Sequence, residues 1–188
     1  RSDWSRGLLQ QVMGVQLGDK TPLVIDADAL QLLAERSQLL SSTRRENWIL
    51  TPHPGEAGVL LNKTTAEIQS DRVASVSELA QRWGGCCLLK GSGSLIGCTR
   101  KGADKKAGSQ SIFLCTEGNA GMASGGMGDV LTGLTTSLLA QGLDLETAIC
   151  CAVCVHGEAA DLAVDFEGQR GLAASDLLPY IRQLVNLS

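Results

Sequence analysis

Short apolar runs alternate with longer amphipathic stretches over the first half of the chain. Three runs, each rich in Leu or β-branched residues, predict strands that are buried on both faces: Pro22 to Asp26, Asn47 to Thr51 and Cys86 to Lys90. Helical patterns follow the first two runs, and this alternation is typical of a parallel sheet with crossover helices. We therefore predict an α/β fold that forms a single domain over residues 1–188.

The rest of the chain predicts one hairpin and several helices. The hairpin joins Leu95 to Cys98 with Ser111 to Thr116 around the polar loop Thr99 to Gln110. Spacing of apolar positions predicts helices over Ser5 to Leu17, Ala29 to Glu35, Gly55 to Leu61, Asp71 to Trp83, Asp129 to Gln141, Leu145 to Val164 and Ala174 to Val185.

Polar segments whose side chains are suited to catalysis or ligand binding follow each of the three predicted strands. They are Asp26-Ala27-Asp28, Thr51-Pro52-His53-Pro54 and Lys90-Gly91-Ser92-Gly93-Ser94. In open α/β sheets, ligands bind beyond the carboxyl ends of the strands, so we expect these three loops to converge on one cleft. The simpler interpretation of both aspartates is that they cap the following helix, and the alternative is that they contact cation-bound water or substrate. Glu56 is interpreted as an acid of a first helical turn.

A glycine-rich segment, Gly118 to Asp129, comes directly before an amphipathic helix. Glycine allows the backbone to approach a ligand closely, and free N–H groups at a helix start form an anion site. We predict that the amides of Gly125, Gly126, Met127 and Gly128 stabilise a charged phosphoryl group. The segment matches neither the dinucleotide fingerprint nor the Walker A pattern. The alternative is that Asp129 only caps the helix.

Composition and charge exclude several classes of protein. A net charge of −4 and a pI of 5.2 argue against nucleic acid as a partner. Polar residues interrupt the apolar stretches before membrane-spanning length, and the N-terminus has no secretion-signal pattern. The seven cysteines are interpreted as reduced, buried thiols of a cytoplasmic protein. Cys150, Cys151, Cys154 and His156 share one apolar helical pattern, which favours core packing over a metal site.

Several segments together resemble one family. GNAGMASGGMGDVLTG, LTPHPGEAGVLL, VIDADALQLLA and LLKGSGS resemble the ADP- or ATP-dependent NAD(P)H-hydrate dehydratases of the ribokinase-like superfamily, and VHGEAADLA and RGLAASDLL extend the resemblance to the C-terminus. It implies a three-layer α/β/α fold with a mostly parallel sheet. By comparison with the family pattern the chain begins late, so we expect a domain that lacks its N-terminal portion.

The resemblance also implies roles for individual residues. Asp129 is expected at the hydrated nicotinamide as the catalytic base, and His53 is expected to contact the hydrated dinucleotide. Residues expected to bind the adenine nucleotide are Lys90, Gly91, Ser92, Gly93, Ser94 and Gly128. The implied substrates are NADHX and NADPHX, with ADP or ATP as phosphoryl donor. The parent protein is expected to be a homo-oligomer, with a fused epimerase domain as a further possibility.

The chemistry can also be argued from the residues. Hydroxide is a poor leaving group, whereas phosphate leaves readily once the hydroxyl has been phosphorylated. Asp129 would take the hydroxyl proton, and the glycine-rich amides would stabilise the transferred charge. The polyphosphate calls for a divalent cation, Mg²⁺, although no carboxylate cluster in the sequence stands out as its ligand. Two alternatives stay open: a small-molecule kinase, such as a vitamin-precursor kinase, and a non-catalytic nucleotide-binding fragment.

Overall fold

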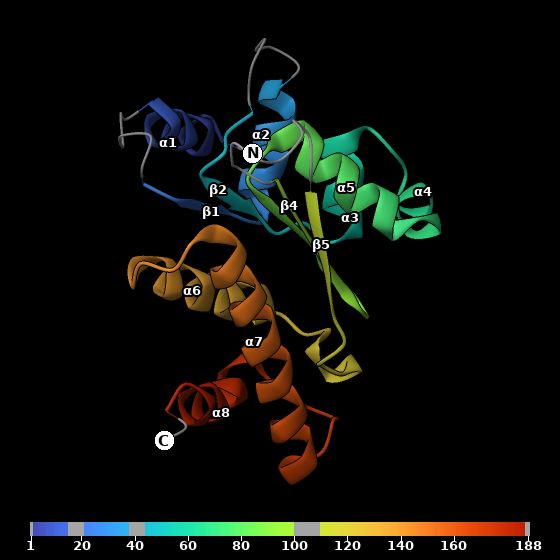
Figure 1. Cartoon of the computed structure of the whole chain (residues 1–188), viewed down its shortest axis with the longest axis vertical. Helices are drawn as coiled ribbons and strands as arrows, with labels where there is room; N and C mark the ends of the chain where they lie inside the picture. Colours follow the sequence, from blue (N-terminus) through green and yellow to red (C-terminus); the bar gives the residue numbers. More distant parts are fainter. Residues whose placement is uncertain (1, 15–20, 38–43, 100–109, 187–188) are drawn as a thin grey trace.

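The computed structural model describes residues 2–14, 21–37, 44–99 and 110–186. Its centre is a five-stranded sheet in the order β1-β2-β3-β4-β5 (Figure 1). The strands are β1 (Leu23–Ile25), β2 (Trp48–Leu50), β3 (Cys86–Leu89), β4 (Ser94–Thr99) and β5 (Gln110–Cys115). The first three strands are parallel, and β4 and β5 each pair antiparallel with the preceding strand. The predicted α/β fold, with parallel strands followed by a hairpin, is confirmed.

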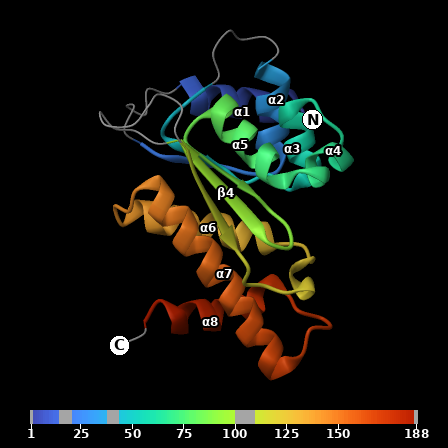
Figure 2. The ribbon, with the colours of Figure 1, turned by 45° about the vertical axis from the view of Figure 1, so that its right-hand side comes forward.

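Helices cover both faces of the sheet and form three layers (Figures 1 and 2). One face carries α2 (Asp28–Ser37), α3 (Pro54–Leu61) and α5 (Arg72–Trp83), with α1 (Asp3–Gly14) beside α2 and α4 (Thr65–Ser70) beside α3 and α5. The other face carries α6 (Met127–Ala140) and α7 (Leu145–Glu167). The 3₁₀ helix η1 (Ala120–Met122) and the terminal α8 (Leu177–Leu184) adjoin α7, and a second 3₁₀ helix, η2 (Ala174–Asp176), packs against α8.

Side chains of the central strands alternate between two hydrophobic clusters. Trp48 and Leu50 of β2 pack with helices α2, α3 and α5, whereas Ile49 between them packs with α6 and α7. Successive side chains of a strand point to opposite faces, so a strand with helices on both sides must be apolar throughout. This explains why the central strands are continuous apolar runs rather than alternating ones.

The structure differs from the predicted elements in a few places. Helix α4 was not predicted; Thr64 and Glu67 form a capping box that starts it after the end of α3. Helix α6 begins at Met127, two residues before the predicted start. Predicted helical residues 15–17 and most of the polar loop, residues 100–109, lie outside the described residues.

The expectation of reduced, buried cysteines is wrong in two respects: one pair is oxidised, and Cys151 and Cys154 of α7 are exposed. Cys86 and Cys98 form a disulfide between β3 and β4. The antiparallel register places these two residues directly opposite each other, with their Cα atoms 4.1 Å apart. Neighbouring strands thus bring together two cysteines that are twelve positions apart in the sequence.

Helix α7 is longer and more apolar than the sequence interpretation allowed. It has 23 residues, and by length and composition alone it is able to cross a membrane. In the structure, half of its most apolar window is buried, and the helix packs against α6 and against strands β2 to β5. Its apolar character is accounted for by its position over one face of the sheet, so it is the principal core helix of that layer.

The contact between α7 and the turn after β5 is tight enough to test. A Cβ atom added to Gly157 would lie 2.8 Å from the backbone of Glu117, whereas one added to Gly133 of α6 would meet nothing within 4 Å. We expect Gly157→Ala to lower the free energy of unfolding by about 1–3 kcal/mol through overpacking. Gly133→Ala should raise it by about 0.5–1 kcal/mol, because alanine is the better helix former. Chemical denaturation of both variants measures this, and equal effects would contradict the predicted contact.

Candidate functional site

The ammonium group of Lys90 lies where the three post-strand loops meet. Its Nζ donates a hydrogen bond to Asp26 Oδ1 at 2.8 Å and lies 3.9 Å from Glu56 Oε2. Asp26 follows β1, Glu56 belongs to the helix after β2, and Lys90 follows β3. The ends of the three strands therefore lie together at Lys90. The cavity described below is lined by the loop from Lys90 to Ser94 and not by residues 26–28 or 51–54, so a cleft shared by all three loops stays a prediction.

Burial makes these interactions stronger than those of surface charges. The side chains of Lys90, Asp26 and Glu56 are only 24%, 14% and 7% exposed. Charges attract more strongly where water is largely excluded, and a buried charge requires a partner. The side chain of Asp26 also accepts a hydrogen bond from Thr132 of α6, at 3.4 Å. The interpretation of Asp26 as a helix cap is thus wrong, because its carboxylate links β1 to Lys90 and to α6.

The N-terminus of α6 lies against this ion pair. A Cβ atom on Gly128 would lie 3.1 Å from Asp26 Oδ2 and 3.7 Å from Lys90 Nζ, so glycine is the residue that fits. Gly126 is the N-cap, with φ +89°, and no side chain caps the helix. Asp129 lies in the first turn and is exposed. The capping interpretation of Asp129 is therefore wrong, and no side chain accepts from the first N–H groups of this helix; that they bind an anion stays a prediction.

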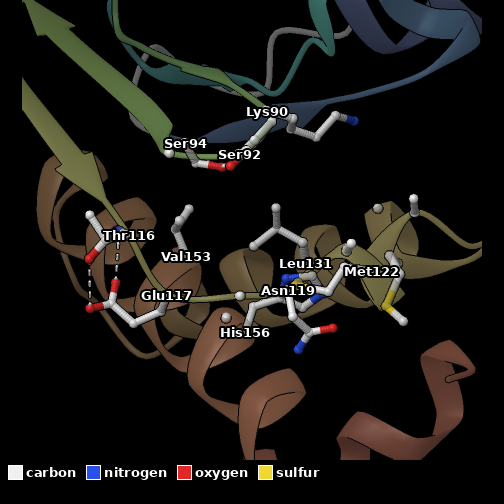
Figure 3. A pocket seen from close by; sticks show the side chains of 18 residues that line it. Lys90, Ser92, Ser94, Thr116, Glu117, Asn119, Met122, Leu131, Val153 and His156 are labelled. Atoms are coloured by element: carbon white, nitrogen blue, oxygen red, sulfur yellow. Dashed lines mark hydrogen bonds between the residues drawn. The ribbon is translucent and has the colours of Figure 1, made fainter. Parts of the chain in front are cut away.

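A cavity of about 410 Å³ opens beside this helix start (Figure 3). Two segments predicted to bind nucleotide face each other across it: the loop from Lys90 to Ser94 and the turn at Met127 and Gly128. Its other lining residues come from the segment after β5 and from α6 and α7: Thr116, Glu117, Gly118, Asn119, Ala120, Met122, Ala123, Leu131, Val153, His156 and Gly157. The volume falls within the usual range of small-molecule sites, about 300–1,000 Å³.

Asp161 of α7 fixes the wall formed by the segment after β5. Its carboxylate accepts hydrogen bonds from the backbone N–H of Gly118, at 2.7 Å, and from Asn119 Nδ2, at 2.8 Å. Asn119 Oδ1 in turn accepts from the N–H of Gly121, at 3.0 Å, and starts η1. Asp161 therefore positions the glycine-rich segment from outside the cavity.

His53 is the N-cap of α3. Its Nδ1 accepts hydrogen bonds from the N–H groups of Gly55, at 3.0 Å, and Glu56, at 3.3 Å, while Glu56 Oε2 accepts from the His53 N–H at 2.8 Å. Nδ1 thus serves as the capping acceptor, and Nε2 lies 3.4 Å from Glu56 Oε1. The side chain is 56% exposed. The ring is held by its cap and still presents an edge to solvent.

His156 is buried in the wall of the cavity that α7 provides. Its ring hydrogen-bonds to the backbone of Met127, and Nε2 has no partner among the described residues. Burial lowers the pKa of His156 to about 4, so the ring is neutral near pH 7. The expectation that this histidine is a packed helix residue is confirmed, and its packing connects α7 to the start of α6.

Comparison with known proteins identifies the family. The sequence profile described as NAD(P)H-hydrate dehydratase matches residues 5–183. The chain belongs to the NAD(P)H-hydrate dehydratase family. It is 45% identical over 99% of its length to a bifunctional NAD(P)H-hydrate repair enzyme of Coxiella burnetii, of which it covers 34%. It is 39% identical over 88% of its length to an ADP-dependent (S)-NAD(P)H-hydrate dehydratase of Neisseria meningitidis, of which it covers 53%.

Solved structures agree with this family and its fold. An ADP/ATP-dependent NAD(P)H-hydrate dehydratase from Bacillus subtilis, co-crystallised with ATP and Mg²⁺, matches with a TM-score of 0.77 and 30% identity. The match covers 94% of this chain and 58% of the Bacillus chain. An Arabidopsis thaliana ribokinase, at 16% identity and a TM-score of 0.58, supports the ribokinase-like fold alone. The chain spans about a third of the length of the bifunctional relatives.

The predicted site residues divide into two groups in this dehydratase-family chain. Lys90 to Ser94, Met127 and Gly128 line one cavity. Gly125, Gly126, Asp129 and His53 are not part of that lining, although the first three adjoin the helix start. Sequence reasoning missed the role of Asp26 as the partner of Lys90 and the role of Asp161 beneath the glycine-rich segment. Both are carboxylates in segments already singled out, DAD and VHGEAADLA, but their partners are 64 and 43 positions away.

The buried neutral His156 predicts a pH dependence of stability in this family member. Its pKa is about 4 in the folded chain and about 6.5 when unfolded, so only the unfolded chain takes up a proton between these values. Stability from this residue is complete above pH 6.5 and falls as the pH drops towards 4, by on the order of 2–3 kcal/mol. His156→Gln should remove this part of the slope. Denaturation midpoints measured from pH 7 to pH 4 test it, and an unchanged slope in the variant would contradict it.

Proposed function

We propose that this chain carries the nucleotide-dependent dehydration step that returns hydrated NADH or NADPH to the reduced cofactor. The observation that carries the proposal is the single cavity shared by the Lys90-to-Ser94 loop and the start of α6. The names of the relatives, which are dehydratases and bifunctional repair enzymes for NAD(P)H hydrate, support the substrate class. ADP or ATP would be the phosphoryl donor.

The cavity has the chemistry that a nucleotide requires. Lys90 supplies a positive charge, and the uncapped N-terminus of α6 supplies free N–H groups and the positive end of the helix dipole. Glycines at positions 91 and 93 have positive φ, 146° and 68°, which lets the loop after β3 turn closely around a ligand. Leu131, Met122 and Val153 provide an apolar wall on which a base can pack.

The reaction would run in two steps. The terminal phosphoryl group of the nucleotide is transferred to the hydroxyl oxygen of the hydrated nicotinamide, and Asp129 takes the hydroxyl proton. The C–O bond then breaks, phosphate leaves with the bonding electrons, and loss of a ring proton restores the C=C bond. Asp129 is suited to the first step because it is exposed on the first turn of α6, one residue after Gly128 of the cavity. His53, with its exposed ring edge, would contact the dinucleotide.

A divalent cation fits the residues that meet here. Mg²⁺ in such sites binds one or two carboxylates together with phosphate oxygens and water. Asp26 and Asp129 provide carboxylates on the elements that meet at the start of α6. The ion, when bound, would neutralise charge on the polyphosphate, while Lys90 and the backbone amides position it. Asp26 is held by Lys90, so contact with the ion through water is more compatible with the observed pair than direct ligation.

Several wider expectations belong to the whole protein. The bifunctional relatives support a fused epimerase domain. A homo-oligomeric state stays a prediction. A cytoplasmic location is supported by the metabolic role of the relatives, whereas the disulfide between Cys86 and Cys98 does not favour a fully reduced chain.

Replacing the proposed base tests the reaction. We expect Asp129→Asn to lower turnover by at least about 100-fold, the range for loss of a general base, with an unchanged nucleotide Kd. The assay supplies hydrated NADH, ADP or ATP and Mg²⁺, and follows recovery of NADH absorbance together with released phosphate. Asp165→Asn, an exposed aspartate elsewhere on α7, is the matched control and should retain activity.

The same assay distinguishes the rival functions. A stable phosphorylated product without NADH recovery would indicate a small-molecule kinase. Nucleotide binding without turnover of the unaltered chain would indicate a non-catalytic nucleotide-binding fragment. Full activity of Asp129→Asn would overturn the role assigned to Asp129 while leaving the dehydratase function intact.

Lys90 should contribute to nucleotide affinity through its charge. We expect Lys90→Ala to raise the Kd for ADP and ATP by about 10- to 100-fold, as for loss of one charge-assisted hydrogen bond of about 1.5–3 kcal/mol. Lys63→Ala is the control, because Lys63 forms a surface ion pair with Glu78 and does not line the cavity. Calorimetric titration at fixed salt and Mg²⁺ measures both variants. Equal affinities in the two would refute a direct role for Lys90.

A further inference from the structure

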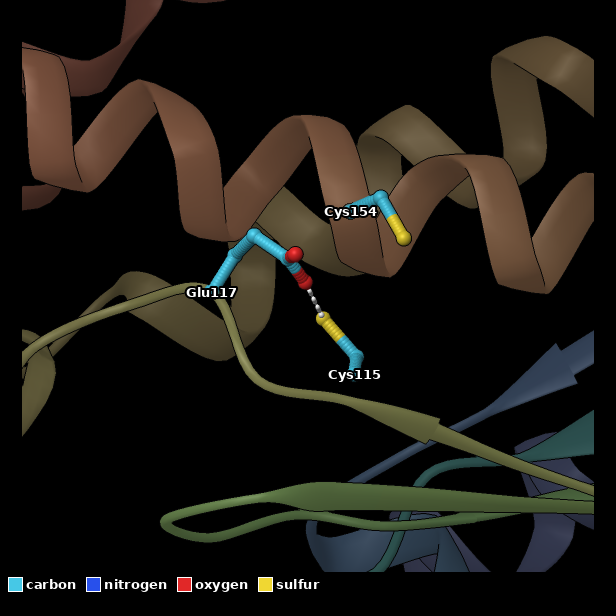
Figure 4. A group of neighbouring side chains, drawn as sticks. All are labelled: Cys115, Glu117 and Cys154. Atoms are coloured by element: carbon cyan, nitrogen blue, oxygen red, sulfur yellow. Dashed lines mark hydrogen bonds between the residues drawn. The ribbon is translucent and has the colours of Figure 1, made fainter.

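Three side chains with metal-ligand chemistry come together between the end of β5 and α7 (Figure 4). They are Cys115 at the end of β5, Glu117 two residues later, and Cys154 on α7. One atom from each, two sulfurs and a carboxylate oxygen, all lie within 4.8 Å of one another. Among the described residues this is the group of potential metal ligands that the fold assembles, and it joins segments 37 or more positions apart.

The local contacts hold the group together on one side and leave it open on the other. The thiol of the buried Cys115 donates a hydrogen bond to Glu117 Oε2 at 3.0 Å, and the same oxygen accepts from the Thr116 N–H at 3.1 Å. Glu117 and Cys154 are exposed. Solvent therefore reaches the group from the side of Glu117 and Cys154, which leaves room for a water molecule as a further ligand.

We infer that Cys115, Glu117 and Cys154 bind one thiophilic divalent metal ion of the Zn²⁺ class. Zn²⁺ accepts sulfur at about 2.3 Å and carboxylate oxygen at about 2.0–2.2 Å in a tetrahedron, so its ligand atoms lie about 3.5–3.8 Å apart. In the structure the Cys115 sulfur lies 3.0 Å from Glu117 Oε2, and all three atoms lie within 4.8 Å of one another, so binding requires only small movements of the side chains. Three protein ligands and one water complete four-coordination.

Binding would exchange protons for the ion. The two thiols lose their protons to solvent as their sulfurs bind the metal, and the hydrogen bond from Cys115 to Glu117 is replaced by two bonds to the same ion. Two positive charges are lost as protons and two are gained as metal, so the charge of the group does not change. Thiolates and a carboxylate favour Zn²⁺ over Mg²⁺, which is a hard cation with oxygen ligands.

The metal site adjoins the cavity and shares one residue, Glu117, with its lining. Thr116, Glu117 and Val153 line the cavity, and Cys115 and Cys154 are their immediate neighbours in sequence. A bound ion would therefore fasten the end of β5 to α7 at this wall. The inference rests on these ligands alone and does not depend on the proposed reaction.

Spectroscopic titration of the full chain tests the site. The protein, kept reduced and stripped of metal, is titrated with Co²⁺ and then with Zn²⁺. We expect one Co²⁺ per chain with a thiolate-to-metal charge-transfer absorption, its displacement by one Zn²⁺, and no displacement by excess Mg²⁺. Cys154→Ser and Cys115→Ser should each weaken binding at least about tenfold, because serine keeps the size of the side chain and removes the sulfur ligand. Glu117→Gln should weaken it as well.

Cys151→Ser is the matched control, since Cys151 is an exposed cysteine on the same helix that lies outside the group. It should bind the ion as the unaltered chain does. Absence of the charge-transfer absorption in the unaltered chain would overturn the inference, as would binding that survives both Cys115→Ser and Cys154→Ser or is lost in Cys151→Ser. Circular dichroism monitors folding. If Cys115→Ser unfolds, the test rests on Cys154→Ser, because Cys154 is exposed.

Discussion

A lysine that is largely removed from water must have anionic partners, and much of this site follows from that constraint on Lys90. Its ammonium group lies between Asp26 and Glu56, so it draws together the ends of β1 and β3 and the helix after β2. A buried ion pair is weak evidence for stability, because desolvation costs about as much as attraction returns. What the pair provides is position: Asp26, held by Lys90, also accepts a hydrogen bond from Thr132 and lies so close to Gly128 that a Cβ atom there would be 3.1 Å from its Oδ2.

Two polar side chains of α7 fix one wall of the cavity in a similar way. Asp161 holds the backbone at Gly118 and the side chain of Asn119, and His156 contacts the backbone of Met127 from α7. Neither residue is on the segment that it positions. The apolar face of α7 packs on the sheet and holds the helix in place. The two polar side chains then fix the glycine-rich segment relative to that helix. The segment itself has few side chains with which to hold its own shape.

The sequence predicted the layers of this fold well and the site only in part, for a physical reason. Continuous apolar runs such as Trp48–Leu50 carry the information that both faces are covered, and the position of loops after parallel strands follows from topology. Pairings between distant residues carry no such local signal. Lys90 and Asp26 are 64 positions apart, and nothing in either segment specifies that the aspartate would bind the lysine rather than cap its helix. The disulfide between Cys86 and Cys98 became evident only with the strand register.

Helix capping was likewise predictable from local sequence at one helix and not at another. Thr64 and Glu67, three residues apart, form a local pattern that fully explains why α4 begins there, even though its short length concealed it. At α6 the pattern misleads, since Asp129 is a favoured capping residue and yet Gly126 takes that place in a left-handed conformation. An uncapped helix start costs stability, because its first N–H groups lose a partner. That cost is compatible with a folded chain when a ligand can supply the missing acceptors, and the start of α6 borders a cavity that the Lys90 loop also lines, as the proposed nucleotide site requires.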